Sequence, residues 1–349
     1  MRTRIAPAVI AAFLTLAATL PAQALDVWTQ PNPGLLHLHR SAPGPAEFHV
    51  LIADLSQPGV RIRITPRAER WQTTSDYALE GKLAGAINAG PWTMFSQRAL
   101  GLAASRGEIW SPDTQRLGYF AVGKDGVASI AGPREPRPNR QNIAEGVAGF
   151  ALLVDAGKVV PKIMQLKQGR DARSAVGVSR DGRKVILVTV DGRRAGSAGA
   201  SLDELAQLFV EFGAERAINL DGGNSTTMFI ANEGGTVNHP ARGWEREVVT
   251  HIGVQAPAPN APAAAARVAE TPKPAQAMAA RPIPQTERGT RGRMSAIWIQ
   301  DRVFIGQLRE WILPGVTAGV PLALVLLLAW LWRRHARRRR AVSQSGRQP

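Results

Sequence analysis

The chain of 349 residues contains no cysteine, only two tyrosines, and far fewer acidic than basic residues. The absence of cysteine excludes a disulfide scaffold, thiol catalysis and any cysteine-ligated zinc or iron–sulfur site. Aspartate and glutamate together number 27 against 43 lysines and arginines, which gives a formal net charge of +16. A charge of this size is typical of nucleic-acid binders, so its distribution along the chain decides how it is interpreted.

Most of the excess charge lies at the two ends. Residues 1–24 and 311–349 together hold nine arginines and no acidic residue, which leaves +7 for residues 25–310. No pattern of stacking aromatic residues accompanies the basic ends. The distribution therefore favours membrane targeting over nucleic-acid binding, and we expect no nucleic acid among the partners.

The N-terminus has the pattern of a secretory signal. Two arginines in the first four residues precede an apolar run from Ile5 to Leu20, and Ala22-Gln23-Ala24 supplies a small-x-small cleavage site. We expect residues 1–24 to be a signal peptide that is cleaved after Ala24. The alternative is an N-terminal membrane anchor that is never cut.

The C-terminal region has the pattern of a membrane span. Residues 312–332 contain no charged side chain, and at 1.5 Å per residue a helix of this length is about 31 Å long, close to the thickness of a bilayer core. The basic tail of residues 333–349 follows directly, and basic segments stay cytoplasmic. We expect a single-pass inner-membrane protein with a periplasmic domain and a cytoplasmic C-terminus. A buried core helix is the alternative, but it does not explain the arginine block.

Composition divides the rest of the chain. Residues 255–292 are dominated by alanine and proline and predict an extended, disordered linker. Residues 293–311 predict a juxtamembrane amphipathic segment. Residues 25–254 remain as the folded unit, for which we expect an α+β, strand-rich single domain with a central twisted β-sheet and a few flanking helices.

Short apolar runs bounded by turn residues predict the strands of this domain. The run Lys184–Val190 is apolar after its first residue, which predicts a central strand covered on both faces. Asp181-Gly182 before it predicts a hairpin. One clear helix is expected over Leu202–Phe212, with Ser201 and Glu204 as its capping box, and a second over Thr74–Leu83. The other expected strands cover residues 48–53, 60–65, 84–89, 101–104, 118–122, 127–130, 151–154, 175–179, 216–220, 227–230 and 249–254.

The most unusual segment for chemistry is residues 217–230. An expected strand delivers Asp221 to its end, and two glycines follow, whose backbone adopts tight turns easily. A carboxylate beside exposed backbone N–H groups is suited to a polar or anionic ligand. The polar members of this loop are candidate ligand-binding residues, namely Gly222, Gly223, Asn224, Ser225 and Thr226. The alternative is an ordinary hairpin turn, which is our interpretation of the Asp-Gly pairs at Asp125 and Asp181.

A second acid, Asp191, ends the expected central strand, and the helix Leu202–Phe212 connects it to the strand that ends near Asp221. If the two strand ends converge, the acids form the pair that glycosidic cleavage uses, in which one protonates the leaving oxygen and the other attacks or activates water. The alternative is two unrelated solvated turns.

Several residues are candidates for binding the substrate around these acids. Arg173 precedes a strand and suits a phosphate group, although a single arginine there is often only a surface charge. Arg246, with Arg242 and His239, precedes the last strand and can join it. Asn88 ends an apolar strand, and Trp92 after it suits a sugar subsite or the core equally well.

The order of seven segments resembles the phosphodiester glycosidase family, the domain of the enzyme that uncovers mannose 6-phosphate by removing a capping N-acetylglucosamine. Along the chain these segments are INAG (87–90), GLAASRGE (101–108), RSAVGV (173–178), VDGR (190–193), SLDELA (201–206), NLDGGNSTTM (219–228) and REVVTHIGV (246–254). The resemblance spans about residues 45–254. Two departures are Pro91-Trp92 in place of an aromatic pair and Asn224 in place of a third glycine.

The resemblance implies hydrolysis of a sugar-1-phosphodiester at the sugar C1–O bond, on an envelope glycan or a glycolipid. It implies that Asp191 and Asp221 are catalytic, and that Asn88, Arg173, Gly222, Gly223, Ser225, Thr226 and Arg246 occupy the family's conserved positions. Two alternatives stay open, a non-catalytic module that binds anionic glycan and a phosphodiesterase that cuts the P–O bond. The sequence requires no cofactor, and a divalent cation at Asp191, Asp221 and Asn219 is open because no ligand spacing demands it.

Overall fold

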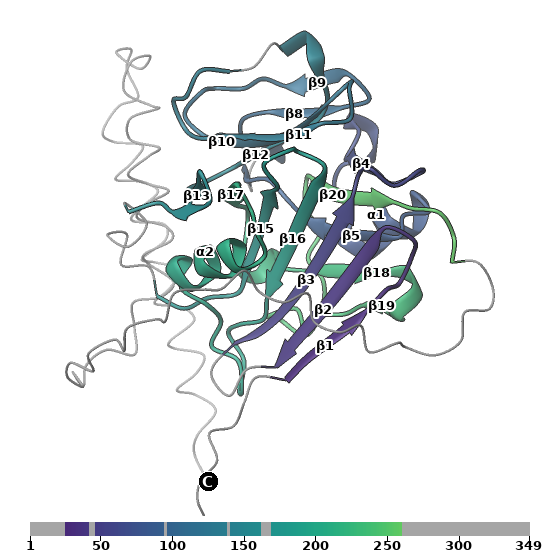
Figure 1. Ribbon diagram of the computed structural model, residues 1–349, viewed down its shortest axis with the longest axis vertical. Coiled ribbons are helices and arrows are strands. Elements are labelled where there is room, and N and C mark those ends of the chain that lie inside the picture. Colours follow the sequence, from purple (N-terminus) through teal and green to yellow (C-terminus); the bar gives the residue numbers. More distant parts are fainter. Residues whose placement is uncertain (1–24, 42–45, 94–95, 138–139, 162–168, 260–349) are drawn as a thin grey trace, which may run out of the picture. The chain divides into compact units, whose positions relative to one another are not determined.

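A computed structural model describes residues 25–41, 46–93, 96–137, 140–161 and 169–259 of the chain (Figure 1). The expected signal peptide, juxtamembrane segment, membrane span and basic tail lie outside these residues, as does most of the expected linker. Among the described residues, no helix is long and apolar enough to cross a membrane.

Eight antiparallel strands form the largest sheet. In the order of the sheet they are β1 (Leu25–Thr29), β2 (Leu35–Ser41), β3 (Glu47–Asp54), β16 (Lys184–Val190), β15 (Arg173–Val178), β17 (Arg216–Asn219), β13 (Leu152–Asp155) and β14 (Lys158–Val159).

The strand β16 lies at the centre of this sheet, as its apolar sequence predicted. It pairs with β3 on one side and with β15 on the other, and every residue after Lys184 is buried. The hairpin from β15 to β16 turns at Asp181-Gly182, where Gly182 adopts a φ of +67°. A residue with a Cβ is disfavoured at that φ, so the glycine permits the tight turn.

Helix α2 (Leu202–Glu211) covers one face of the large sheet (Figure 1). Both hydrogen bonds of the predicted capping box between Ser201 and Glu204 are present. Its apolar side chains, with Leu205 and Phe209 fully buried, pack on residues such as Val188 of β16. The expected end at Phe212 is confirmed to within one residue, since Phe212 is the C-cap.

The opposite face of the large sheet packs on two five-stranded sheets through the main hydrophobic core. One of these sheets has the order β11 (Ala128–Ala131), β10 (Gly118–Gly123), β12 (Ile143–Gly149), β8 (Ala103–Ser105) and β9 (Glu108–Ser111). The other has the order β19 (Gly235–Thr236), β18 (Met228–Ile230), β5 (Gly85–Asn88), β20 (His251–Gln255) and β4 (Arg61–Ile64). A short hairpin of β6 (Trp92–Thr93) and β7 (Arg98–Ala99) and helix α1 (Thr74–Glu80) complete the described elements that position the site.

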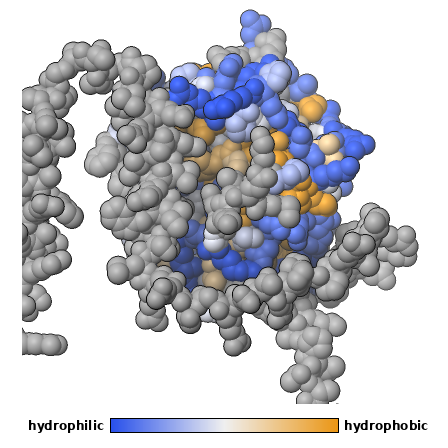
Figure 2. All heavy atoms as spheres, turned by 90° about the vertical axis from the view of Figure 1, so that its left-hand side faces the viewer, coloured by the Kyte–Doolittle hydropathy of each residue, from blue (hydrophilic) through white to orange (hydrophobic). Residues whose placement is uncertain are grey.

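The described part of the chain is therefore strand-rich, mostly sheet, with two α-helices and a few short 3₁₀ turns. The expected single strand-rich domain is confirmed, and each of the expected strands overlaps an observed one. Eight observed strands were not among the expected ones, namely β1, β2, β6, β7, β9, β12, β14 and β19. On the face shown in Figure 2, hydrophilic residues surround a few apolar patches.

Candidate active site at the ends of β16 and β17

The sheet order brings both predicted acids to one edge. Because β15 lies between β16 and β17 and is antiparallel to each, β16 and β17 run in the same direction. Their C-terminal ends, and the start of β15 at Arg173, therefore meet at the same edge of the sheet. Asp191 follows β16 directly, and Asp221 comes two residues after β17 ends.

The glycine loop after Asp221 folds tightly against the segment that precedes β15. The Gly223 N–H donates to the carbonyl of Ala172 at 2.8 Å, and Gly223 adopts a φ of +63°. A Cβ on Gly222 would lie 2.8 Å from that same carbonyl oxygen. Both glycines are therefore required by the backbone geometry of the loop. This explains their place in the motif without a contact to a ligand.

The remaining predicted loop residues differ in their exposure. Ser225 and Thr226 are each 1% exposed, so their hydroxyl groups lie inside the loop. Asn224 is half-buried, and its Oδ1 accepts a hydrogen bond from Arg193 Nη1 at 3.1 Å. Of these three side chains, Asn224 is the most accessible.

Asn88 connects the loop to the sheet. Its side chain is fully buried, with Nδ2 donating to the carbonyl of Asp221 at 2.6 Å and Oδ1 accepting from the hydroxyl of Ser174 at 2.6 Å. The same Oδ1 accepts from the Thr227 N–H at 3.2 Å. Asn88 thus bonds the carbonyl of Asp221 and the N–H of Thr227 in the loop and ties both to Ser174 of β15.

Of the two acids, Asp221 is the one that is partly accessible to solvent. Its side chain is half-buried, and its N–H donates to the carbonyl of Ala89 at 2.8 Å. Burial raises the pKa of Asp221 above the ordinary aspartate value, while the side chains of Ser225 and Trp92 and the charge of Arg246 act to lower it. Burial is the largest of these effects, so the environment favours the protonated carboxyl.

An aromatic and cationic surface adjoins Asp221. The guanidinium of Arg246 lies 4.5 Å from the ring centre of Trp92, and Trp71 meets Trp92 edge to face at 5.0 Å. Burial lowers the pKa of Arg246, and the nearby carboxylate of Asp221 raises it. Trp92 therefore lies beside both the acid and the arginine, which favours the subsite among the two roles that the sequence left open.

Asp191 is fully buried and strongly hydrogen bonded. Its Oδ1 accepts from Asn238 Nδ2 at 3.0 Å, and both carboxylate oxygens lie 3.0 Å from the backbone N–H of His239. Oδ2 also lies 3.1 Å from His239 Nδ1 and 3.4 Å from Arg194 Nη2. Burial raises the pKa of Asp191, and the bonds from Asn238 and His239 lower it.

Asn238 links the surroundings of the two acids. The same Nδ2 that bonds Asp191 also lies 3.3 Å from the carbonyl of Thr226 in the glycine loop, and Asn238 Oδ1 accepts from the Met228 N–H at 2.7 Å. Sequence reasoning assigned no role to Asn238. A lone asparagine 17 residues after Asp221 carries no local signal, so only the tertiary contacts reveal it.

The predicted arginines take different positions. Arg173 is 6% exposed, and its Nε and Nη2 donate to the carbonyls of Ala200 and Gly169, so it joins two chain segments at the sheet edge. Sequence reasoning gave no role to Arg193. It forms a bidentate ion pair with Asp171, in which Nε and Nη2 donate to the two carboxylate oxygens at 2.6 and 2.8 Å. The charge of Asp221 contributes to a raised pKa of Arg193, so this guanidinium also lies near the acid.

One group of side chains in the described part of the chain can hold a metal ion, namely Glu47, Asp191 and His239. Their ligand atoms all lie within 4.8 Å of one another. The group contains Asp191 but neither Asp221 nor Asn219, the other two residues named above for a divalent cation. Asn219 instead donates from Nδ2 to the carbonyl of Leu220 at 3.1 Å.

Two acids thus lie at one sheet edge, with guanidinium groups near Asp221. The sequence profile of the phosphodiester glycosidase family matches residues 81–255. The chain belongs to this family, which confirms the resemblance seen in its sequence.

Solved structures share the fold. A hypothetical protein from Synechocystis superposes with a TM-score of 0.53 at 18% identity, covering 67% of this chain and 64% of that one. The catalytic domain of zebrafish N-acetylglucosamine-1-phosphodiester alpha-N-acetylglucosaminidase, auto-inhibited by its pro-peptide, gives 0.50 at 19% identity, with 66% and 82% covered.

A sequence relative is known from Bacillus subtilis (strain 168). The SPbeta prophage-derived uncharacterized protein YomE is 28% identical over 203 residues, which is 53% of this chain. The match covers 30% of that relative, so the chain spans less than a third of its length.

Proposed function

We propose that this chain is a hydrolase that cleaves a sugar-1-phosphodiester at the bond between the sugar C1 and oxygen. The observation that carries the proposal is the environment of Asp221, a half-buried carboxyl next to Trp92 and Arg246 on a loop that Asn88 holds in place. Family membership supports a glycosidase-type activity. The substrate proposed is a phosphodiester-linked sugar of an envelope glycan or glycolipid.

In this reaction the C1–O bond breaks and water supplies a hydroxyl group to C1, so the products are a free sugar and a phosphate monoester. We assign the proton transfer to Asp221, because its burial favours a carboxyl that is still protonated when the substrate arrives. Arg246 and Arg193 lie near this carboxyl and are suited to hold the negative charge of the phosphate.

Asp191 has a different part in the proposal. Its carboxylate has no exposed surface and accepts hydrogen bonds from Asn238, His239 and Arg194. It therefore fixes the segment of Asn238 and His239, which bonds to the glycine loop. We therefore propose that Asp221 contacts the substrate and that Asp191 maintains the geometry around it.

The test is release of sugar from an aryl or alkyl sugar-1-phosphodiester. Asp221→Asn should lower turnover by at least ~100-fold, the usual contribution of a positioned acid or base. Asp181→Asn is the matched control, because Asp181 also precedes a glycine but lies in the hairpin between β15 and β16. This control should keep full activity.

The same assay separates the alternatives by their products. Sugar-1-phosphate instead of free sugar would identify a P–O-cleaving phosphodiesterase. Binding of the substrate without turnover by the unaltered protein would identify a non-catalytic glycan-binding module. Normal turnover by Asp221→Asn would contradict the assignment of the acid.

The raised pKa of Asp221 adds a check on the fold of the variant. Because the folded pKa lies above the unfolded value, the contribution of Asp221 to stability is present at low pH and is lost as the pH rises through the folded pKa. Asparagine does not titrate, so Asp221→Asn should be more stable than the unaltered protein at pH 7, and this gain should shrink as the pH falls. Loss of activity with a gain in stability excludes unfolding as the cause.

We also propose that the domain is anchored at the inner membrane, on the periplasmic side. The support is the uncharged stretch of residues 312–332 and the arginine-rich segment that follows it.

A further inference from the structure

A chain of hydrogen bonds on β2 and β3 fixes the proton positions of two histidines. Glu233, in the 3₁₀ turn Ala231–Glu233, lies with Oε2 at 2.5 Å from His37 Nδ1, and His37 Nε2 lies 3.2 Å from His49 Nδ1. A carboxylate accepts, so in a neutral His37 Nδ1 carries the hydrogen and Nε2 is the acceptor. His49 Nδ1 must then donate, which leaves the Nε2 of His49 with an unshared electron pair.

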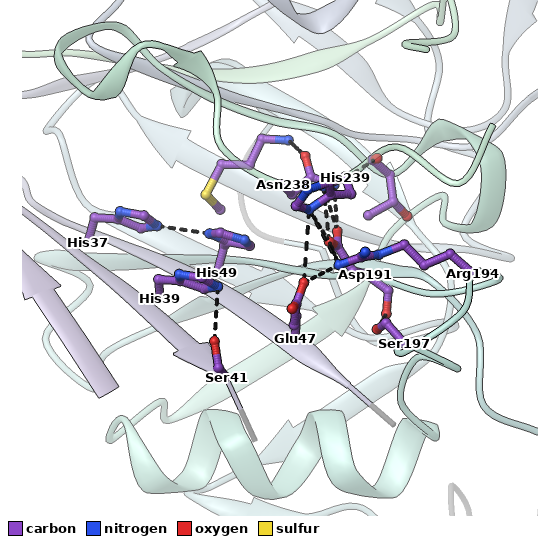
Figure 3. A network of polar contacts seen from close by, with 12 residues as sticks. His37, His39, Ser41, Glu47, His49, Asp191, Arg194, Ser197, Asn238 and His239 are labelled. Atoms are coloured by element: carbon purple, nitrogen blue, oxygen red, sulfur yellow. Dashed lines mark hydrogen bonds and ion pairs between the residues drawn. The ribbon is translucent and has the colours of Figure 1, made fainter. Parts of the chain in front are cut away.

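That nitrogen of His49 is a buried acceptor without a partner among the described residues. His49 is 3% exposed. In Figure 3 its ring extends away from His37 toward the side where Glu47, Asp191 and His239 gather. The electrostatic influence of His239 on His49 agrees with this proximity.

The three side chains on that side already converge. His239 Nδ1 lies 3.1 Å from Asp191 Oδ2 and 3.9 Å from Glu47 Oε2. The His239 side chain is 66% exposed, so solvent reaches the cluster from its side. The ligand atoms of Glu47, Asp191 and His239 lie within 4.8 Å of one another, and the ring of His49 extends toward them in Figure 3.

Arg194 supplies positive charge to this cluster in the structure (Figure 3). A single nitrogen, Nη2, makes its ion pair with Glu47 and lies 3.4 Å from both Asp191 Oδ2 and His239 Nδ1. Its Nε is buried without a partner among the described residues. A guanidinium that bonds the cluster through one of its three nitrogens is a poor match for the site.

We propose that Glu47, Asp191, His239 and His49 form a binding site for one divalent transition-metal ion, and that the ion displaces the guanidinium of Arg194. The site goes beyond the proposed reaction, in which no step was assigned to a metal. Glu47 and His49 also precede residues 81–255, the range that the family profile matches.

The donor set favours zinc. Two imidazole nitrogens and two carboxylate oxygens are typical of Zn²⁺ sites, whereas Ca²⁺ and Mg²⁺ select oxygen ligands alone. The charge also fits, because a doubly positive ion balances both carboxylates where one guanidinium balances half of their charge. His49 is hydrogen bonded to His37, and His37 to Glu233. Histidines that bind metals usually have such a hydrogen bond from the ring nitrogen that does not face the metal.

The ion would stabilise the candidate active site through Asn238. Because Asn238 Nδ2 bonds both Asp191 and the carbonyl of Thr226, an ion that fixes Asp191 also fixes one end of the glycine loop. We therefore assign the ion a structural part. It does not touch the acid assigned to the chemistry.

Zinc binding to the full-length protein, first stripped of metal with a chelator, tests the proposal. Titration calorimetry and competition with a chromophoric chelator should show one Zn²⁺ per chain and much weaker binding of Mg²⁺ and Ca²⁺. Glu47→Gln and His239→Gln should each weaken zinc binding at least ~10-fold, and His37→Gln should weaken it by ~10–100-fold, as loss of an outer partner does. Circular dichroism checks that each variant is folded.

Two variants separate a built site from a chance one. Arg194→Gln removes the competing cation and should tighten zinc binding, an effect that a merely structural Arg194 would not produce. Glu108→Gln is the matched control, because Glu108 is an exposed carboxylate on β9, away from the cluster, and it should bind zinc like the unaltered protein.

Three results would overturn the proposal. The first is that the unaltered protein binds no stoichiometric zinc. Zinc binding by Arg194→Gln alone also overturns the proposal, because the guanidinium is then the cation that normally occupies the site. The second is binding that Glu47→Gln and His239→Gln leave unchanged. The third is weaker binding by Arg194→Gln. None of these readouts uses turnover, so the proposed hydrolase activity stands or fails separately.

Discussion

His251 on β20 is buried in uncharged form, and acid should unfold the domain partly through it. The side chain is fully buried, stacks on Tyr77 at 4.6 Å between ring centres, and has Nδ1 3.1 Å from the hydroxyl oxygen of Thr65. Burial lowers the pKa of His251 to about 3, from an ordinary value of 6.5. Below pH 6.5 the unfolded chain therefore takes up a proton at this position that the folded protein does not.

The size of the effect follows from proton linkage. A histidine of pKa 6.5 in the unfolded chain gains about 2 kcal/mol from protonation at pH 5 and almost nothing at pH 7. The folded form stays neutral at both pH values. The protein should thus lose about 2 kcal/mol of unfolding free energy through His251 over this range, a large part of the 5–15 kcal/mol typical of a domain.

Urea denaturation of the unaltered protein and of His251→Asn at pH 7 and pH 5 measures this term. Carboxyl groups with raised pKa values, such as Glu145 and Asp221, gain stability as the pH falls. They are present in both proteins and cancel in the comparison. The unaltered protein should lose about 2 kcal/mol more than the variant between the two pH values. Equal losses would refute the reasoning that His251 is neutral when folded. His49, whose pKa burial lowers to about 2, should give a change of the same sign.

Two further predictions concern the backbone and the membrane. Gly199→Ala should destabilise the fold by several times the ~1–2 kcal/mol of an unfavourable φ, because at a φ of +90° its Cβ would overlap the carbonyl of Asp171. Gly213→Ala, at a φ of +75° with no atom within 4 Å of the added Cβ, should cost only the smaller amount in the same urea assay. Truncation after residue 311 should release the domain from membranes on fractionation, and continued sedimentation of this variant with membranes would contradict an anchor at residues 312–332.

Local sequence was enough to predict the elements whose signals are contained in a few residues. The capping box at Ser201, the apolar spacing of Leu202–Phe212 and the Asp181-Gly182 turn each predicted a feature that is present. Strands with weaker patterns were not predicted. β12 is interrupted by glycine and alanine, and β2 alternates histidine with leucine, so neither has a continuous apolar run.

The candidate site was predictable only in part. Asp191 and Asp221 stood out because each follows a buried strand, and the sheet order does bring their strand ends to one edge. The sequence did not indicate how unequal their surroundings are. Asp191 has no exposed surface, whereas Asp221 is half-buried beside Trp92. Burial depends on which distant segments cover a side chain, and no short motif contains that information.

By itself, the sequence determined the strand-rich class, the central strand, the capped helix and the family, because periodicity, turn chemistry and motif order are local properties. The tertiary structure alone decided that Arg173 joins backbone segments, that Asn238 joins Asp191 to the glycine loop, and that Glu47 approaches Asp191 from a strand more than 130 residues earlier. These contacts arise from the pairing of β3 with β16, and strand pairing between distant segments is set by the packing of the whole core.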